Sequence, residues 1–348
     1  MRNETSAKKN PLSMQIDPEL FALATAEEKA TQVLEKDSVS FMRDAMRRLV
    51  QNRLAMACLC IIVLIALIAA IVPSFYPYTY TGQDVSGANM APFRYSPKEH
   101  AKIAKEQPVF PHIMGTDELG RDYAIRVIYG TRISLLVGVI AAVIVVVIGI
   151  IYGAISGYFG GRTDLIMMRI VDIIYSLPDV LIVILLSVAI KDAVSTTNSQ
   201  MVAKLGAGMI SIFIVFGLLY WVGMARQVRG QILSIKEQEY VLASRSIGAS
   251  PMRIIRKHMI PNCVSVIIII AALQIPNAIF TESFLSFLGL GVSMPMPSLG
   301  SLASTARTSM QSYPHLLIFP ALSIFLIVLS FNLLGNGLRD AFDPKLRA

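Results

Sequence analysis

Six long apolar runs divide this chain of 348 residues, and polar or charged segments separate them. A helix that crosses a lipid bilayer needs about 20 mostly apolar residues. Lipid offers the backbone no hydrogen bonds, so only helices or closed barrels span it. The pattern therefore predicts an all-α membrane protein with six transmembrane helices. They are expected within residues 54–72, 133–157, 165–190, 205–225, 263–288 and 316–338.

Basic residues beside the apolar runs predict the orientation of the chain, because Lys and Arg favour the cytoplasmic side of a membrane. Six crossings that start in the cytoplasm return the loop 226–261 and the C-terminus to that side. The loop between the first two runs carries seven basic residues against six acids, but long loops follow this rule less strictly. The N-terminus is placed in the cytoplasm by Arg43, Arg47, Arg48 and Arg53.

The organisation expected from these assignments has five parts. Residues 1–53 form a cytoplasmic tail, and residues 54–76 form the first transmembrane helix. A long extracytoplasmic loop follows over residues 77–132. Residues 133–338 form a five-helix core that contains the cytoplasmic loop, and residues 339–348 form a second cytoplasmic tail.

The composition excludes several classes of function. With 54% hydrophobic residues and a mean hydropathy of +0.60, the chain is too apolar for a soluble domain. Its net charge of +8 lies mostly at positions that flank the membrane, where basic residues meet anionic lipid, so no nucleic-acid partner is needed. The sequence lacks a phosphate-binding loop, a metal-spaced His pair and a nucleophile elbow. It therefore predicts a protein that is not an enzyme and holds no metal or cofactor.

A polar island over residues 239–262 lies between two of the apolar runs. Gly248 suits the left-handed conformation that closes a helix, Ser250 can cap the next helix, and Pro251 suits its first position. The island thus predicts two short helices with a sharp corner, which are too short to fold without something to lie against. An ordinary cytoplasmic loop at the membrane surface is the simpler alternative.

This island resembles the Glu-Ala-Ala loop of permease subunits of ABC importers, in which a short coupling helix docks into a groove on an ATPase subunit. Gly248 and Pro261 keep the family's spacing of thirteen residues, whereas the triplet is degraded to Leu-Ala-Ser and its acid is displaced to Glu239. The resemblance implies that a set of residues couples this chain to an ATPase. These residues are Glu239, Tyr240, Ala243, Ser244, Gly248 and Pro261.

Three further segments are similar to the peptide and nickel class of these permeases. Residues 114–135 resemble the entrance segment, residues 282–291 the exit of the fifth span, and residues 332–344 the C-terminal signature. The motifs run in order over residues 43–348 and lie closest to the second permease subunit of oligopeptide and dipeptide importers. Two departures are Leu299 before Gly300, where the family commonly has Trp, and Asn336, where it commonly has Asp.

The resemblance implies an ATP-driven importer in the plasma membrane of a prokaryote that works by alternating access. The expected partners are a sister permease subunit in a heterodimer, two ATP-binding subunits that hold ATP and Mg²⁺, an extracytoplasmic substrate-binding protein, and membrane lipid. Oligopeptides, dipeptides, glutathione and nickel chelates all use similar permeases. The resemblance also makes Asp117, Arg121 and Asp122 of the entrance segment candidates for docking the binding protein.

Two carboxylates inside the apolar runs are candidates for the translocation pathway. An ionisable group in hydrocarbon costs a few kcal/mol unless it is paired or hydrated. Asp179 follows Pro178, whose missing N–H can kink the helix and turn the carboxylate to the interior of the bundle. Glu282 lies near the outer end of its run, where it lines a cavity or is a structural group at an interface that pairs with the sister subunit, and the sequence leaves both possibilities open.

An ion-coupled secondary transporter that uses Asp172, Asp179 and Glu282 is the alternative function. The sequence shows no internal repeat and these acids are not clustered, which favours the ABC permease. Asp172 follows Arg169 at the spacing of an ion pair within one helix.

Three glycines, Gly149, Gly153 and Gly157, form a smooth strip on one predicted helix. Such a strip lets another helix approach closely, either in this subunit or in its sister.

Overall fold

A computed structural model describes residues 41–196, 200–292 and 296–342 of the chain. The chain divides into two compact units, Met1–Asp44 and Ala45–Ala348. The first contributes only the opening residues of one helix to the described part, so the interpretation of residues 1–40 lies outside it. The second unit contains every feature discussed below.

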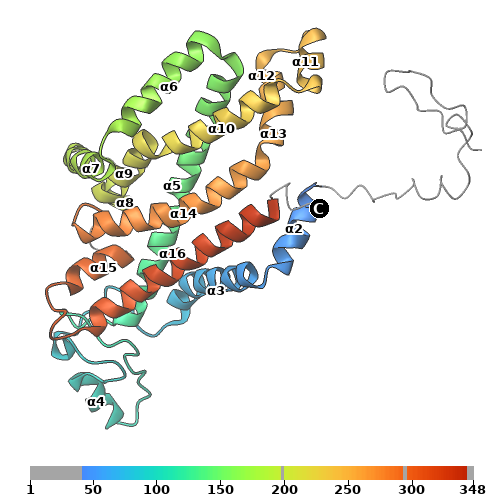
Figure 1. Ribbon diagram of the computed structural model, residues 1–348. Helices are drawn as coiled ribbons and strands as arrows, with labels where there is room; N and C mark the ends of the chain where they lie inside the picture. Colours follow the sequence, from blue (N-terminus) through green and yellow to red (C-terminus); the bar gives the residue numbers. More distant parts are fainter. Residues whose placement is uncertain (1–40, 197–199, 293–295, 343–348) are drawn as a thin grey trace, which may run out of the picture. The chain divides into compact units, whose positions relative to one another are not determined.

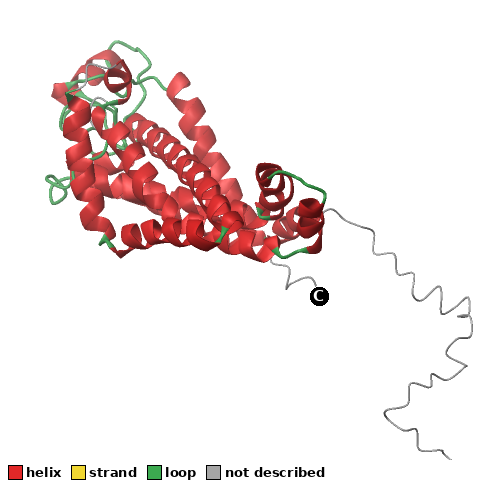
Figure 2. Cartoon of the chain, turned by 90° about the horizontal axis from the view of Figure 1, so that it is seen from above, coloured by secondary structure: helices red, strands yellow, loops and turns green. Residues whose placement is uncertain are grey.

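The described residues are nearly all helical, as the sequence predicts (Figures 1 and 2). Two isolated bridges, Arg94 to His112 and Thr116 to Asp122, are the only extended pairings among them. The helices in chain order are α2 (Phe41–Gln51), α3 (Arg53–Phe75), η2 (Val85–Gly87), α4 (Pro97–Ile103), α5 (Tyr123–Phe159), α6 (Gly161–Ser176), α7 (Asp179–Ser195), α8 (Gln200–Leu205), α9 (Ala207–Val215), η3 (Phe216–Tyr220), α10 (Trp221–Lys236), α11 (Glu239–Ser246), α12 (Pro251–Ile254), η4 (Ile255–Met259), α13 (Ile260–Asn262), α14 (Val264–Phe287), α15 (Leu299–Ala306) and α16 (His315–Phe342).

Five stretches of the described chain are long and apolar enough to cross a membrane: α3, α5, α9 with α10, α14 and α16. A sixth is obtained if α6 and α7 are counted as one span, which is bent by 94°. The sequence predicts a single span there that Pro178 can kink, whereas the structure has two separate helices. The difference arises at Pro178, because the residue before a proline is pushed out of the helical region, and Leu177 accordingly has ψ of 143°.

Helix α5 is longer than the apolar pattern indicates. It begins at Tyr123 rather than at residue 133, so the segment before it ends earlier than expected. The carboxylate of Asp122 caps the helix, because its Oδ1 accepts a hydrogen bond from the Ile125 N–H at 2.9 Å. The first part of α5 contains polar residues such as Arg126, so it is not recognisable as part of an apolar run.

The glycine strip of α5 is the contact between α5 and α10. A Cβ at Gly153 would lie 2.4 Å from the carbonyl oxygen of Ala225 and 2.9 Å from Cβ of Val228. A Cβ at Gly149 would lie 2.4 Å from the side chain of Met224 in α10, and one at Gly157 would lie 2.8 Å from the side chain of Ile232 in α10. The strip therefore serves packing inside this subunit, the first of the two possibilities that the sequence leaves open.

Helix α5 contacts most of the other spans. It packs against α10, α14 and α3, while α14 also packs against α16, and α16 against α3 (Figure 1). Apolar side chains fill these contacts, including Val137, Val145, Ile212 and Ile232, which are almost completely buried. The bundle thus holds α10 and α14 against α5, and the corner at α11 and α12 joins these two helices in the chain.

Candidate functional site

The polar island forms the corner that the sequence predicts. Helix α11 ends at Ser246, and Gly248 follows with φ of +78°, the left-handed region that favours glycine. The N–H of Gly248 donates to the Arg245 carbonyl at 2.9 Å, and the Ala249 N–H donates to the Ser244 carbonyl at 3.1 Å. These two bonds satisfy carbonyls at the end of α11 and turn the chain sharply.

The second limb differs from the predicted short helix. Pro251 opens α12 and Ser250 occupies its N-cap position with extended backbone, as expected, but the Ser250 side chain makes no capping hydrogen bond. The limb then continues through η4, a π turn, and through α13 towards α14. Pro261 lies in α13 and has no backbone N–H to donate. The π turn η4, which is wider than an α-helical turn, ends two residues before this proline. The limb is thus an extension of span α14.

The corner exposes large apolar side chains. Leu242 is 49% exposed, Ile247 is 85% exposed and Met252 is 57% exposed. Each would be stabilised by burial against another surface, at roughly 25 cal/mol per Å² of apolar area removed from water. Leu242 belongs to the degraded triplet, whereas Ile247 and Met252 were not predicted from the sequence, although apolar residues inside a polar island are the signal that identifies them. The corner therefore has the character of a docking surface.

The residues expected to couple to an ATPase all lie on this corner or its second limb. The side chains of Glu239, Tyr240 and Ala243 are exposed, as is Pro261. The Ser244 side chain is buried instead, and its hydroxyl donates to the carbonyl of Tyr240 at 2.8 Å. The exposed residues could contact a partner directly, whereas Ser244 holds the helix.

Basic side chains border the corner on the second limb. They line a wide, shallow surface recess, whose lining contains no carboxylate. An acidic partner surface would be attracted there, because like charges in one recess sum their potentials. The lining residues are Ser250, Met252, Arg253, Arg256 and Lys257.

Contacts behind the corner connect it to the bundle. The guanidinium of Arg245 lies over the ring of Tyr158 in α5, 5.0 Å from its centroid. Val241 and Ile254 are completely buried and belong to the main apolar cluster. A displacement of the corner would consequently act on α5 as well as on α10 and α14.

Glu282 is completely buried in this chain. Its carboxylate accepts hydrogen bonds from the hydroxyls of Ser134 at 2.9 Å, Ser286 at 2.7 Å and Ser283 at 3.3 Å. Ser134 belongs to α5, so the carboxylate links α14 to α5. The partners observed are hydroxyls of this chain, so the environment is that of an anchor within the subunit, whereas the alternative to the cavity role expected from the sequence was an anchor to the sister subunit.

Replacing Glu282 with alanine is expected to lower the stability of the protein by about 1–3 kcal/mol, because buried hydroxyls lose their acceptor. Thermal unfolding of the purified protein in mild detergent measures this. The matched control is Glu237→Ala, which removes an exposed acid and should leave unfolding unchanged. Unchanged unfolding of the Glu282 variant, with altered preference for charged substrates, would instead support the cavity role.

The other intramembrane acids are placed as follows. Asp179 begins α7 directly after the bend, and its side chain lies outside the described part of the structure. Asp172 pairs with Arg226 of α10, whose Nη2 lies 2.7 Å from its Oδ1. The expected partner, Arg169, is not the one observed, because the close approach of α10 to α6 brings a second cation within reach.

The three docking candidates of the entrance segment are buried. Oδ2 of Asp117 accepts from Nε of Arg121 at 2.7 Å and lies 3.4 Å from Nε of Arg126. Its Oδ1 accepts from the backbone N–H groups of Leu119 and Arg121 at 3.0 Å. With 5% exposure for Asp117, 8% for Arg121 and 2% for Asp122, these side chains shape the segment from within. Their part in docking stays a prediction, and burial makes that part indirect.

A buried polar cluster continues from Asp122. Nδ1 of His112 lies 2.6 Å from Oδ2 of Asp122, and its Nε2 lies 3.3 Å from Oε1 of Glu99. Tyr78 stacks on the His112 ring with 4.5 Å between centroids, and its hydroxyl donates to Glu99 at 2.7 Å. Burial and this bond to Glu99 raise the pKa of Tyr78 above its ordinary value. These partners were not predicted from the sequence, because they are spread over residues 78–112 without a shared motif.

Replacing Asp122 with alanine should destabilise the protein more than replacing it with asparagine. Alanine loses the cap of α5, worth about 1 kcal/mol, and also leaves the buried His112 without this partner. Asparagine keeps an oxygen for the cap, but its amide nitrogen is a donor and replaces the acceptor oxygen beside His112. Melting temperatures in detergent are measured for both variants and for the unchanged protein. If Asp122→Ala melts at the same temperature as the unchanged protein, Asp122 does not stabilise the structure in this way.

Comparison with known proteins adds two matches over most of the chain. Residues 147–348 match the family described as binding-protein-dependent transport system inner membrane component. Residues 40–92 match the N-terminal TM domain of oligopeptide transport permease C. The first match includes the corner at Gly248, and the second includes helix α3.

Several bacterial transport proteins resemble this chain over nearly its whole length. The oligopeptide transport system permease protein OppC of Bacillus subtilis is 43% identical over 332 residues, which cover 95% of this chain and 99% of that protein. The dipeptide transport system permease protein DppC of the same organism is 42% identical over 96% of this chain and 95% of its own length. OppC of Escherichia coli is 41% identical over 92% of this chain and 96% of its own length.

Proposed function

The chain belongs to the family of binding-protein-dependent transport system inner membrane components, and we propose that it is the membrane-spanning subunit of an ATP-driven peptide importer. The helical bundle with five or six candidate spans provides the membrane part. The names of its relatives, oligopeptide and dipeptide permeases, favour peptides as the substrate. One observation carries the coupling proposal: the corner between α10 and α14 exposes large apolar side chains, although it lies in a polar segment.

The proposed assembly contains several chains. This subunit pairs with a sister permease subunit, two ATP-binding subunits hold ATP and Mg²⁺, and an extracytoplasmic binding protein delivers the peptide. The assembly lies in the plasma membrane of a prokaryote, with both termini of this chain and the corner on the cytoplasmic side. No enzymatic step is assigned to this chain, because the partner subunits hydrolyse the ATP.

The coupling surface consists of α11, the turn at Gly248 and the basic recess of the second limb. Exposed apolar side chains would enter a groove on the ATPase subunit, and Arg253 and Arg256 would attract an acidic rim around it. Closure of the ATPases on ATP would displace the corner. Because α10 and α14 continue from its two limbs, the displacement would reach two spans at once.

The transport step would be a rigid-body change between inward-facing and outward-facing arrangements. ATP favours one arrangement only as far as the partner subunits bind it more tightly in that state. The close α5–α10 contact makes these helices move together, whereas the bend between α6 and α7 offers a place where the bundle can deform. Asp179 remains a candidate for the pathway, and Glu282 would act on it indirectly by holding α14 to α5.

Affinity purification of the tagged chain in mild detergent tests the proposal, followed by identification of the proteins that co-elute. Two ATPase subunits and a second permease are expected in the eluate, and ATP hydrolysis should be stimulated by a peptide-loaded binding protein. A chain that purifies alone and transports peptides with a proton or sodium gradient would contradict the proposal and indicate a secondary transporter.

A further inference from the structure

Two irregular stretches of backbone face one another inside the membrane part of the bundle. The first is the break at Leu177 and Pro178 between α6 and α7, and the second is the π turn η3. Within hydrocarbon, backbone without regular helical bonding is tolerated only where protein buries it or a hydrated cavity adjoins it. This chain does not bury the break, since Leu177 is 39% exposed and Tyr175 is 64% exposed.

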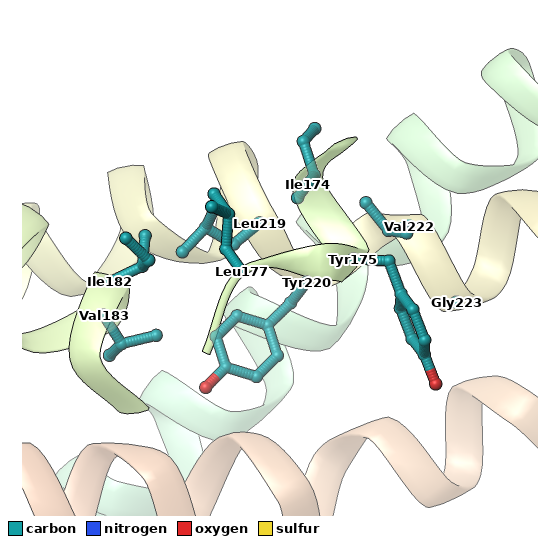
Figure 3. Close-up of a pocket in the computed structure, with 9 residues that line it drawn as sticks. All are labelled: Ile174, Tyr175, Leu177, Ile182, Val183, Leu219, Tyr220, Val222 and Gly223. Atoms are coloured by element: carbon teal, nitrogen blue, oxygen red, sulfur yellow. The ribbon is translucent and has the colours of Figure 1, made fainter. Parts of the chain in front are cut away.

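A pocket of about 120 Å³ lies between these two stretches. Figure 3 shows side chains from α6, α7 and η3 around it, with the rings of Tyr175 and Tyr220 projecting towards the same side. The Tyr220 hydroxyl lies 3.4 Å from that of Thr281 in α14, so the pocket adjoins a third span. Its apolar lining consists of Ile174, Leu177, Ile182, Val183, Leu219 and Val222.

The size and lining of the pocket indicate what it can hold. An apolar cavity of about 150 Å³ accepts benzene, so 120 Å³ suits a single medium-sized hydrocarbon group. Gly223 also lines the pocket, and a Cβ there would meet no atom within 4 Å, so the space beside it is open.

Polar groups border one side of the pocket. The Arg226 guanidinium lies 4.2 Å from the centroid of the Tyr175 ring and is paired with Asp172 at 2.7 Å. A peptide whose side chain enters the pocket would meet the Tyr175 hydroxyl and this ion pair with its backbone. An apolar recess with polar groups at its border is a common arrangement in ligand sites.

We propose that this pocket receives an aliphatic or aromatic side chain of the transported peptide and so contributes to selectivity in the membrane. The inference rests on the proposed function and deepens it, because it assigns part of the discrimination among peptides to this chain. Two regular helices would pack closely at this point and leave no space between them. The break between α6 and α7 and the π turn interrupt that packing, and this leaves the pocket.

The test measures ATP-dependent uptake by the complete complex of three tripeptides with a middle Ala, Leu or Phe. Each rate is divided by the fraction of binding protein loaded with that peptide, which removes the selectivity of the binding protein. Gly223→Leu should fill the pocket and lower the uptake of the Leu and Phe peptides about tenfold relative to the Ala peptide, the lower end of the scale on which apolar pockets discriminate.

The matched control is Gly230→Leu on the same helix. A Cβ at Gly230 also meets no atom within 4 Å, and this residue does not line the pocket. The ratios between the three peptides should therefore stay at those of the unchanged complex. A second variant, Leu177→Ala, enlarges the pocket and should raise the uptake of a peptide with a middle Trp relative to the Leu peptide.

Three outcomes would overturn the inference. Unchanged peptide ratios in both pocket variants would show that no peptide side chain enters the pocket. An equal fall for all three peptides in Gly223→Leu would indicate that a side chain of the sister subunit occupies it. Absence of ATP-dependent uptake for every peptide in the unchanged complex would contradict the proposed function itself, and this result is distinct from the other two.

Discussion

Replacing Gly248 with valine is expected to abolish ATP-dependent uptake while the subunits remain associated. Gly248 has φ of +78°, and no atom lies within 4 Å of the position that a Cβ would occupy. The obstacle is therefore the backbone conformation, which costs an ordinary residue roughly 1–2 kcal/mol and a β-branched one more. Relief of that strain would turn the exposed side chains of Leu242 and Ile247 away from their groove.

Asparagine at the same position is the matched control, because its short polar side chain tolerates the left-handed region. Gly248→Asn should retain most of the uptake. Uptake by proteoliposomes and co-purification of the ATPase subunits are measured for both variants. Normal uptake by Gly248→Val with the ATPases attached would refute the proposal that this corner couples ATP to transport.

Gly153→Val should prevent the bundle from assembling. Its Cβ would lie 2.4 Å from the backbone oxygen of Ala225 and 3.0 Å from the backbone nitrogen of Arg229. A change of rotamer cannot relieve a clash with backbone, so α5 and α10 must separate. Overpacking of a core costs about 1–3 kcal/mol, and contact with backbone places this variant at or above the upper end.

The loss is measured as the yield of monodisperse protein in detergent and as the melting temperature. Gly230→Ala on α10 provides the comparison, since the added methyl group enters open space and also favours the helix. If Gly153→Val is produced at normal yield and melts normally, the α5–α10 contact does not hold the bundle together.

The membrane helices could be predicted from the sequence because each apolar run is itself the physical cause of insertion. The corner was also predictable, since a left-handed glycine and a proline at the first helical position are local signals. By contrast, the extent of the break at Pro178 was not predictable, because a proline can kink a membrane helix or end it, and the choice depends on neighbouring helices.

Long-range polar contacts were the main feature that the sequence could not reveal. Asp122 was expected as a docking candidate on the outer face, yet it is buried, caps α5 and pairs with His112. Glu282 was expected to line a cavity or to pair with the sister subunit, yet its carboxylate accepts a hydrogen bond from Ser134 on another helix of the same chain. Such pairs join residues far apart in the chain, so spacing carries no information about them.

We expect this chain to transport peptides only when partner ATPases act on its corner. The most direct measurement is the uptake of a labelled peptide into proteoliposomes that contain this chain, its sister permease and both ATPase subunits, with loaded binding protein outside. Uptake is expected to require ATP inside the vesicles and to stop with vanadate or with Gly248→Val. Uptake driven by an ion gradient without ATP, and insensitive to both, would contradict the account.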